Sequence, residues 1–301
     1  MPFYPGSADY RDGLITIKDA LNNPTSIEQR IAEIADKNLL VDSLFTSGGE
    51  VTGGAVIYSS ITEKHLYTSD IADRQPGDEY KVVYAERPES RLAKVQDFGG
   101  KFAVSDEARK RNLTVDFDND VTMLTNTIVR KINANAIGTL EAAIETGEVK
   151  TLAVTAPWDT VTLDGNPANI SPSSQRPTAD FAHAQQMADE LEMGIQYTKL
   201  LVSPSVHATL KVIYAERLQD VMDAFGLEIL SSVHMPAGKA YLVDPGKVGF
   251  VRYEEPLTVN TWRDEAHRQT WVQGYAMPVM GVTNPNAVCV INGTTSTSSQ
   301  E

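Results

Sequence analysis

The chain has 301 residues, with 26 lysine and arginine residues against 40 aspartate and glutamate residues, and a formal net charge of -14 at pH 7. Because this charge repels phosphates, the composition argues against a protein that holds nucleic acid by phosphate neutralisation. The single cysteine, Cys289, lies in the apolar run 287–291, so we expect a buried thiol and no disulfide within the chain. No segment has the pattern of a secretory signal or of a membrane helix, which favours a cytosolic protein of about two domains.

The first third of the chain has the pattern of an arm followed by a long loop. Residues 1–47 contain one short amphipathic helix that Ser26 can cap. Residues 50–104 alternate strand-forming runs with glycine and proline, including a type II turn at Pro76-Gly77 and a strand at 80–84. This loop holds few large aliphatic side chains and is too long for an ordinary connection, so we expect it to lie on a partner.

Residues 112–147 predict one long amphipathic helix. Asp116, Asp118 and Asp120 suit the positive end of its dipole, and Gly147 stands where a C-cap needs positive φ. The apolar stripe consists of Val121, Leu124, Ile128, Val129, Ile132, Ala136, Leu140, Ala143 and Ile144. About 30 residues at roughly 1.5 Å each make a rod of about 45 Å. A rod of this length behind a projecting loop is typical of a wide, thin tile for assembly.

A mixed α/β pattern follows. The proline-rich stretch 151–177 is expected to cross between two lobes, and Thr178 is expected to cap the next helix. Ser203-Pro204 predicts another helix, with serine as its N-cap and proline at its first position. The other expected elements are a buried strand at 197–202, a helix at 218–225, strands at 227–233 and 240–243, and a β-rich stretch at 248–291.

This order of parts resembles the major capsid protein of tailed bacteriophages, which has the Hong Kong phage capsid fold. The resemblance is carried by the arm, the extended loop, the helix start Ser105-Asp-Glu-Ala108, the long helix and the central lobe with Leu201-Val-Ser-Pro204. Ala240-Tyr-Leu-Val-Asp244, a β-rich return and Asn286-Ala-Val-Cys-Val-Ile291 are similar to the closing pattern of that family.

The resemblance implies an α+β fold with six segments. These are an N-terminal arm at 1–47, an E-loop formed by an extended β-hairpin at 48–104, a peripheral domain with the long spine helix at 105–155, an α/β axial domain at 156–245, peripheral return strands at 246–291 and a flexible tail at 292–301. In that family the arm and E-loop embrace neighbouring subunits, and the axial domains form the centres of pentamers and hexamers.

Patterns of catalysis or metal binding are weak in this chain. Residues 116–120 imitate the start of an EF-hand, but Val121 replaces the required glycine and Thr127 the bidentate glutamate, so helix capping is the better interpretation. The glycine pairs lack the ending of a P-loop, and the five histidines lack ligand spacing. No Gly-x-Ser-x-Gly motif occurs, although a triad of distant residues stays open. We therefore expect no enzyme, no cofactor and no metal site.

Two groups of residues are candidates for contacts between subunits. The segment 262–271 is dense in charge and bracketed by Trp262 and Trp271, which fits either an interface strip or a strand pair with one solvated face. The capsid resemblance favours contact with a neighbour. The candidate interface residues are Tyr58, Lys64, His65, Tyr67, Arg74 and Lys81 in the loop, and Trp262, Arg263, Asp264, Arg268 and Trp271 in the strip.

The resemblance implies a structural function. The chain is expected to assemble with itself, through heterologous contacts that close into pentamers and hexamers, into the icosahedral head of a tailed phage. This shell would enclose double-stranded DNA without sequence-specific binding. Its further partners would be scaffolding, portal and decoration proteins. It would form in the host bacterial cytoplasm without a membrane. The alternatives are an encapsulin-like compartment that holds cargo enzymes and, more remotely, a soluble hydrolase.

Overall fold

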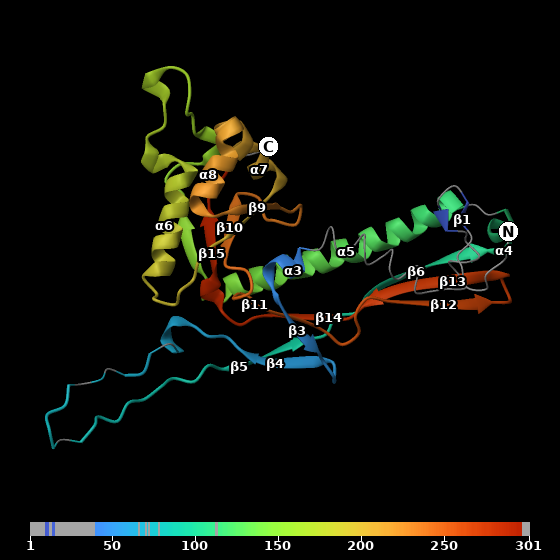
Figure 1. Cartoon of the computed structure of the whole chain (residues 1–301), viewed down its shortest axis with the longest axis horizontal. Coiled ribbons are helices and arrows are strands. Elements are labelled where there is room, and N and C mark those ends of the chain that lie inside the picture. Colours follow the sequence, from blue (N-terminus) through green and yellow to red (C-terminus); the bar gives the residue numbers. More distant parts are fainter. Residues whose placement is uncertain are drawn as a thin grey trace.

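The computed structural model describes residues 10–11, 14–15, 40–65, 67–69, 71, 73–77, 79–111 and 114–296. The expected helix after Ser26 and the last residues of the tail lie outside this part of the chain. Within the arm, β1 (Tyr10–Arg11) pairs with β2 (Leu14–Ile15). Figure 1 shows an upright lobe, a long helix that runs away from it above a sheet, and a hairpin that projects on the side opposite the lobe.

The long helix is α5 (Thr114–Glu145), which confirms the prediction. It ends just before Gly147, whose φ is +75°. Of the predicted stripe, Leu124 and Ile144 are half-buried, and the other members are buried. Thr125 is buried in the same face because its hydroxyl donates a hydrogen bond to the Val121 carbonyl at 2.7 Å. The side chains of Asp116 and Asp118 lie outside the described part of the helix.

A five-stranded sheet forms the centre of the upright lobe. Its strand order is β7 (Lys150–Ala153), β15 (Val288–Asn292), β10 (Lys239–Val243), β8 (Lys199–Val202) and β9 (Glu228–Ser231). The sheet separates two cores. Val288 and Val290 pack into the core that α5 shares, whereas Cys289 and Ile291 pack into the core under the lobe helices. Because both faces are covered, the strand is a continuous apolar run rather than an alternating one.

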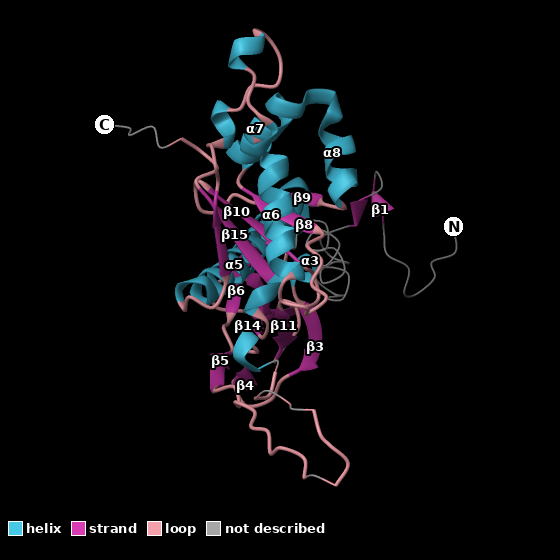
Figure 2. Ribbon diagram, turned by 90° about the vertical axis from the view of Figure 1, so that its left-hand side faces the viewer, coloured by secondary structure: helices cyan, strands magenta, loops and turns pink. Residues whose placement is uncertain are grey.

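Three helices cover the far face of this sheet, as Figures 1 and 2 show: α6 (Pro177–Asp189), α7 (Pro204–Tyr214) and α8 (Leu218–Phe225). The Ser203 hydroxyl accepts a hydrogen bond from the Val206 amide at 3.4 Å, and Pro204 is the first helical residue, as predicted. The predicted cap at Thr178 is wrong. The helix begins two residues earlier than a cap at Thr178 implies, because Pro177 has the φ that a first helical residue needs, and Arg176 precedes it without a side-chain cap.

The short 3-10 helices of the lobe and its flanks are η2 (Trp158–Thr160), η3 (Pro167–Asn169), η4 (Ser173–Gln175), η5 (Ala215–Arg217) and η6 (Pro285–Ala287). Trp158 is fully buried and donates its indole hydrogen to buried Asp180 at 2.7 Å. Burial raises the pKa of the Asp180 carboxyl, and the indole hydrogen bond opposes that rise. This pair fixes the crossing loop to α6.

Two three-stranded sheets lie beneath α5. One has the order β12 (Thr258–Asp264), β13 (Gln269–Ala276) and β6 (Phe98–Ser105), and the other has the order β14 (Pro278–Val282), β11 (Gly249–Tyr253) and β3 (Thr46–Glu50). A Cβ at Gly100 would lie 2.7 Å from the end of the Leu124 side chain, so a larger residue here would force that side chain to shift. Two short helices, α3 (Val41–Leu44) and α4 (Asp106–Arg111), flank these sheets, and the Ser105 hydroxyl caps α4 as predicted.

The projecting hairpin has a strand-paired stem and a tip in which the Ser69 amide donates a hydrogen bond to the Tyr84 carbonyl at 2.9 Å. The stem is β4 (Ala55–Ser59) paired with β5 (Ser90–Lys94), and η1 (Glu63–His65) follows β4. Gly77 has the positive φ that the predicted turn needs. The predicted strand at 80–84 is wrong, because that extended segment pairs with no strand among the residues that the structure describes.

Two observations bear on the expected segment boundaries. Residues 98–105 pair with β13 under α5, so the projecting part is shorter than residues 48–104. The last strand, β15, joins the sheet of the upright lobe rather than the return strands beneath α5. The division of the chain into arm, E-loop, peripheral domain and axial domain therefore stays a proposal with revised edges.

Candidate functional site

The strip at 262–271 is a hairpin with an aromatic pair on its outer face. Trp262 on β12 lies directly opposite Trp271 on β13, and the two rings stack with their centroids 6.3 Å apart. Val272, the next residue on β13, packs with Val121 of α5. Since strand side chains alternate between faces, the tryptophans lie on the face turned away from the helix. Trp262 remains 39% exposed, which leaves an aromatic surface open to contact.

Lys101 of β6 completes this aromatic surface. Its ammonium nitrogen lies 4.6 Å from the ring centroid of Trp271 and 5.7 Å from that of Trp262. A cation over indole rings is attracted by their electron-rich faces. The contact joins the third strand to the predicted pair, so Lys101, Trp262 and Trp271 form one patch, which we call the tryptophan patch.

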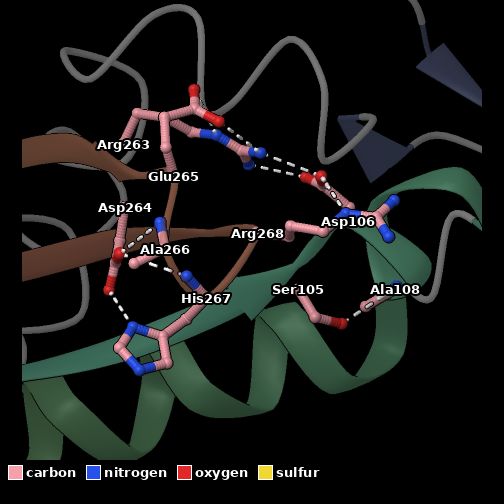
Figure 3. A network of polar contacts seen from close by, with 9 residues as sticks. All are labelled: Ser105, Asp106, Ala108, Arg263, Asp264, Glu265, Ala266, His267 and Arg268. Carbon is pink, nitrogen blue, oxygen red and sulfur yellow. Dashed lines mark hydrogen bonds and ion pairs between the residues drawn. The ribbon is translucent and has the colours of Figure 1, made fainter.

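The turn between β12 and β13 is held by charged side chains, shown in Figure 3. Arg263 donates to both carboxylate oxygens of Asp106, at 2.6 and 2.9 Å, and to Glu265 at 3.1 Å. The Asp106 amide in turn donates to the Arg268 carbonyl at 3.0 Å. The Arg263 guanidinium holds the pKa of the Asp106 carboxyl below its usual range. The turn is thereby clamped to the start of α4.

Asp264 organises the inside of the same turn. Its carboxylate accepts hydrogen bonds from the Ala266 and His267 amides at 3.1 and 3.3 Å and lies 2.9 Å from the His267 ring. The hydrogen bond to the His267 side chain, with smaller contributions from Trp271, the His267 amide and Gln269, lowers the pKa of Asp264 to about 2. Arg268, which follows these residues in the turn, has a φ of +52°, an uncommon conformation for arginine. The charged residues of the strip thus pair within the subunit, and the tryptophan patch is its open surface.

The hairpin stem rests on a small core of its own. Val56 packs with Val51, Phe250 and Val279, and the ring of Tyr58 meets Phe250 edge to face, with centroids 5.4 Å apart. Tyr58 is therefore half-covered by its own subunit, and its predicted part in a subunit contact is untested. This core anchors β4 and β5 to β11 and β14, and the tip of the hairpin lies outside it.

The other predicted residues of the hairpin are spread along its exposed tip. Lys64 and Lys81 are exposed, and the His65 ring lies 2.9 Å from the Thr62 hydroxyl. Arg74 lies over the Tyr80 ring at 4.5 Å, and the Tyr67 hydroxyl reaches the Leu191 carbonyl of the lobe at 3.4 Å. These residues do not converge on one point, which is the geometry of an extended contact rather than of a binding pocket.

The hairpin also concentrates exposed apolar side chains. Among the described residues, the large hydrophobic side chains exposed on it are Ile57, Ile61, Tyr67, Ile71, Tyr80, Val82, Val83, Tyr84 and Leu92. Contiguous exposed apolar surface of this kind is typical of contact sites. Figure 1 places the tip of the hairpin and the tryptophan patch at opposite ends of the subunit, so they cannot meet within one chain.

Several contributors to these surfaces carry no local signal in the sequence. Lys101 joins the tryptophan patch from a strand far away in the chain, and Asp106 clamps the turn from α4. Only the strand register brings them together. Among the described residues, no group of three or more His, Cys, Asp and Glu side chains is placed to hold a metal ion. In the same part of the chain, no helix has both the length and the apolar character needed to cross a membrane.

Comparisons with solved structures confirm the expected Hong Kong phage capsid fold. The subunit of a virus-like particle from Pyrococcus furiosus is 15% identical, with a TM-score of 0.60, over 89% of this chain and 98% of that one. A phage-related protein from Bordetella bronchiseptica RB50 is 13% identical, with a TM-score of 0.57, over 88% and 97% of the two chains. A capsid chain of cyanophage P-SCSP1u is 11% identical, with a TM-score of 0.56, over 98% and 93%.

No curated protein sequence matches this chain. The family described as phage capsid protein matches residues 88–291. That range includes the stem strand β5, the long helix, nearly all of the upright lobe and the tryptophan patch, and it covers more than half of the sequence. The chain therefore belongs to the phage capsid protein family.

Proposed function

We propose that this capsid protein assembles through head-to-tail contacts into pentamers and hexamers of an icosahedral phage head that encloses double-stranded DNA. Scaffolding, portal and decoration proteins would be further partners, and assembly would occur in the host cytoplasm. The observation that carries the proposal is an exposed, incompletely stabilised hairpin at one end of a subunit whose other end presents an open aromatic patch.

The hairpin supports this proposal because its tip cannot be stabilised by the subunit alone. Ordering a residue costs about 1–2 kcal/mol of backbone entropy, and an isolated two-stranded hairpin is marginal in water. Tyr80, Val82 and Tyr84 are 74%, 66% and 76% exposed, so they return little burial energy in the free subunit. Each would contribute roughly 1.5–3 kcal/mol when a neighbour covers it. Docking on a second copy would therefore stabilise the hairpin.

The placement of the two surfaces favours a ring. A contact between different patches on successive copies is heterologous, and it closes when the rotation between copies divides a full turn. The hairpin tip and the tryptophan patch lie at opposite ends of the subunit, which is the arrangement such a contact requires. We propose that the hairpin acts as the E-loop and that the face carrying the tryptophan patch belongs to the surface that receives it.

Hydrogen exchange on unassembled protein tests the clasping part of this proposal. We expect the amides of residues 67–84 to exchange at nearly unprotected rates, those of β4 to be partly protected, and those of α5 between Ile128 and Leu140 to be strongly protected. In assembled shells, residues 67–84 should gain protection. If they are already protected as well as α5 in the free subunit, the hairpin belongs to the core of the subunit and the clasping proposal fails.

A second prediction concerns DNA. With a net charge of -14, the free subunit is expected to show no tight, salt-sensitive binding to duplex DNA, because phosphate contacts would make affinity fall steeply with salt. Fluorescence anisotropy of a labelled duplex, titrated with subunit at low and at physiological salt, measures this directly. Tight binding at low salt that disappears at high salt would contradict a shell whose inner wall lets the genome move.

Electron microscopy of particles from cells that express the gene within its phage, and from cells that express it alone, tests the function as a whole. Shells filled with DNA support the proposed phage head. Shells that contain protein cargo would favour an encapsulin-like compartment, and a preparation that stays monomeric under both conditions would overturn the assembly proposal.

A further inference from the structure

One carboxylate holds both arms of the projecting hairpin at the point where they leave the stem. The last paired residues of the stem are Ser59 and Ser90. Next to them, Glu148 accepts a hydrogen bond from the Ser60 hydroxyl at 3.2 Å on the outgoing arm and forms an ion pair with Arg91 at 2.5 Å on the returning arm. Glu148 lies just beyond the end of α5, so it ties the hairpin to the rigid long helix.

The contacts of Glu148 are buried enough to restrain the direction of the hairpin. Ser60 is 4% exposed, and the side chains of Arg91 and Glu148 are 33% and 25% exposed. The adjacent Ile61 amide donates to the Thr283 carbonyl at 2.7 Å, which adds a second tie to the outgoing arm. A hydrogen-bonded ion pair in partial shelter is stronger than a fully exposed pair and is weakened less by salt.

Next to this contact the stem has room to move. A groove of about 540 Å³ separates β5 from α5, and its helix side is lined by small residues, including Gly138 and Ala142. A Cβ added at Gly138 would meet nothing within 4 Å. The core around Val56 anchors the stem to β11 and β14, but on the side of α5 this groove leaves space between the stem and the helix. The Glu148 contacts bridge the two across one end of this groove.

We infer that Glu148 is a positioning residue that sets the direction in which the hairpin leaves the subunit before assembly. In the proposed head-to-tail contact, that direction determines where the tip meets the next copy and hence the curvature of the ring. This consequence for shells rests on the proposed function. The restraint on the hairpin in the free subunit does not depend on it.

Distance measurements on the unassembled subunit test the inference. The one native cysteine, Cys289, is fully buried and burial raises the pKa of its thiol to about 12, so thiol-reactive spin labels should spare it. Labels at Glu89→Cys, next to the last stem pair of the hairpin, and at Lys131→Cys on α5 then report the angle by electron–electron double resonance. Both positions are exposed. The doubly labelled protein that keeps Glu148 should give one narrow distribution of distances between the two labels.

Glu148→Gln keeps the size of the side chain and removes its charge. We expect a broader label distance distribution and about tenfold faster exchange of the Ile61 amide, with an unchanged thermal melt. The charge swap Glu148→Arg with Arg91→Glu should restore the narrow distribution. The matched control is Glu228→Gln, which breaks the 3.2 Å ion pair with Lys199 in the lobe and should change neither readout. If Glu148→Gln does not fold, Arg91→Met tests the same contact from the other side.

Each outcome decides between the inferences. An unchanged distance distribution and unchanged Ile61 exchange in a folded Glu148→Gln variant overturn the positioning role, whether or not the protein forms shells. A broadened distribution with shells of normal size and yield supports the restraint but overturns its role in curvature. A broadened distribution with particles of mixed size supports both. If protein with Glu148 intact forms no shells while its distance distribution is narrow, the proposed function fails and the restraint stands.

Discussion

Ile132→Asp is expected to destabilise the subunit so strongly that shells no longer form and the protein misassembles or aggregates. Ile132 lies in the middle of α5, is 4% exposed and packs into the core shared with the lobe sheet. Removing a buried isoleucine side chain costs about 2–5 kcal/mol, and an unpaired buried carboxylate adds several more. A domain has roughly 5–15 kcal/mol of stability in total, so little would remain.

Met123→Asp is the matched control, because Met123 lies on the same helix and is 66% exposed. It introduces the same charge at the cost of about 0.7 kcal/mol of helix propensity or less. Urea unfolding followed by circular dichroism measures the loss of stability, and electron microscopy measures the yield of shells. A midpoint for Ile132→Asp equal to that of Met123→Asp would show that the buried stripe of α5 does not hold the subunit together.

Deleting residues 62–78 is expected to abolish stable shells while the subunit stays folded. The deleted residues precede the exposed Tyr80 and Tyr84 and form one side of the tip, which lies beyond the small core under the stem. Their loss removes the reach of the hairpin and almost none of the subunit's own burial, so the thermal melt of the monomer should stay cooperative at nearly the same temperature. Sedimentation and electron microscopy measure the loss of shells.

A milder variant separates the effect of hairpin length from the effect of the exposed apolar side chains. Replacing Tyr80, Val82 and Tyr84 by serine keeps the chain length and removes the exposed apolar side chains, and we expect it to lower the yield of shells as well. Val233→Ser in the lobe is the control, because Val233 is 82% exposed and lies outside the hairpin. Normal shells from the deletion variant would show that the tip of the hairpin is not a clasp.

Local patterns in the sequence were sufficient to predict the elements that depend on contacts within a few residues. The length and buried face of α5 follow from its periodic stripe, and the start of α7 follows from Ser203-Pro204, because caps and periodicity act within a few residues. The burial of Cys289 follows from the apolar run around it. The resemblance to capsid proteins rested on the order of these parts, and the fold comparison and family match agree with it.

Strand pairing could not be predicted in the same way. Residues 80–84 have strand-forming side chains but pair with no strand in the described part of the chain, so their propensity produces only an extended segment. Residues 98–105 pair with β13 under α5, although they follow the hairpin directly in sequence. A strand exists only where another strand supplies hydrogen bonds, and that partner lies far away in the chain.

By itself, the sequence determined the long helix α5, the start of α7, the buried run around Cys289 and a loop with few large aliphatic side chains, because these properties depend on near neighbours and on apolar composition. Only the tertiary structure decided that β15 separates two cores, that Lys101 lies over the two tryptophans, and that Glu148 joins both arms of the hairpin to the end of α5. Each of these contacts joins residues from distant parts of the chain, and the relative placement of those parts follows from the packing of the whole subunit rather than from any local pattern.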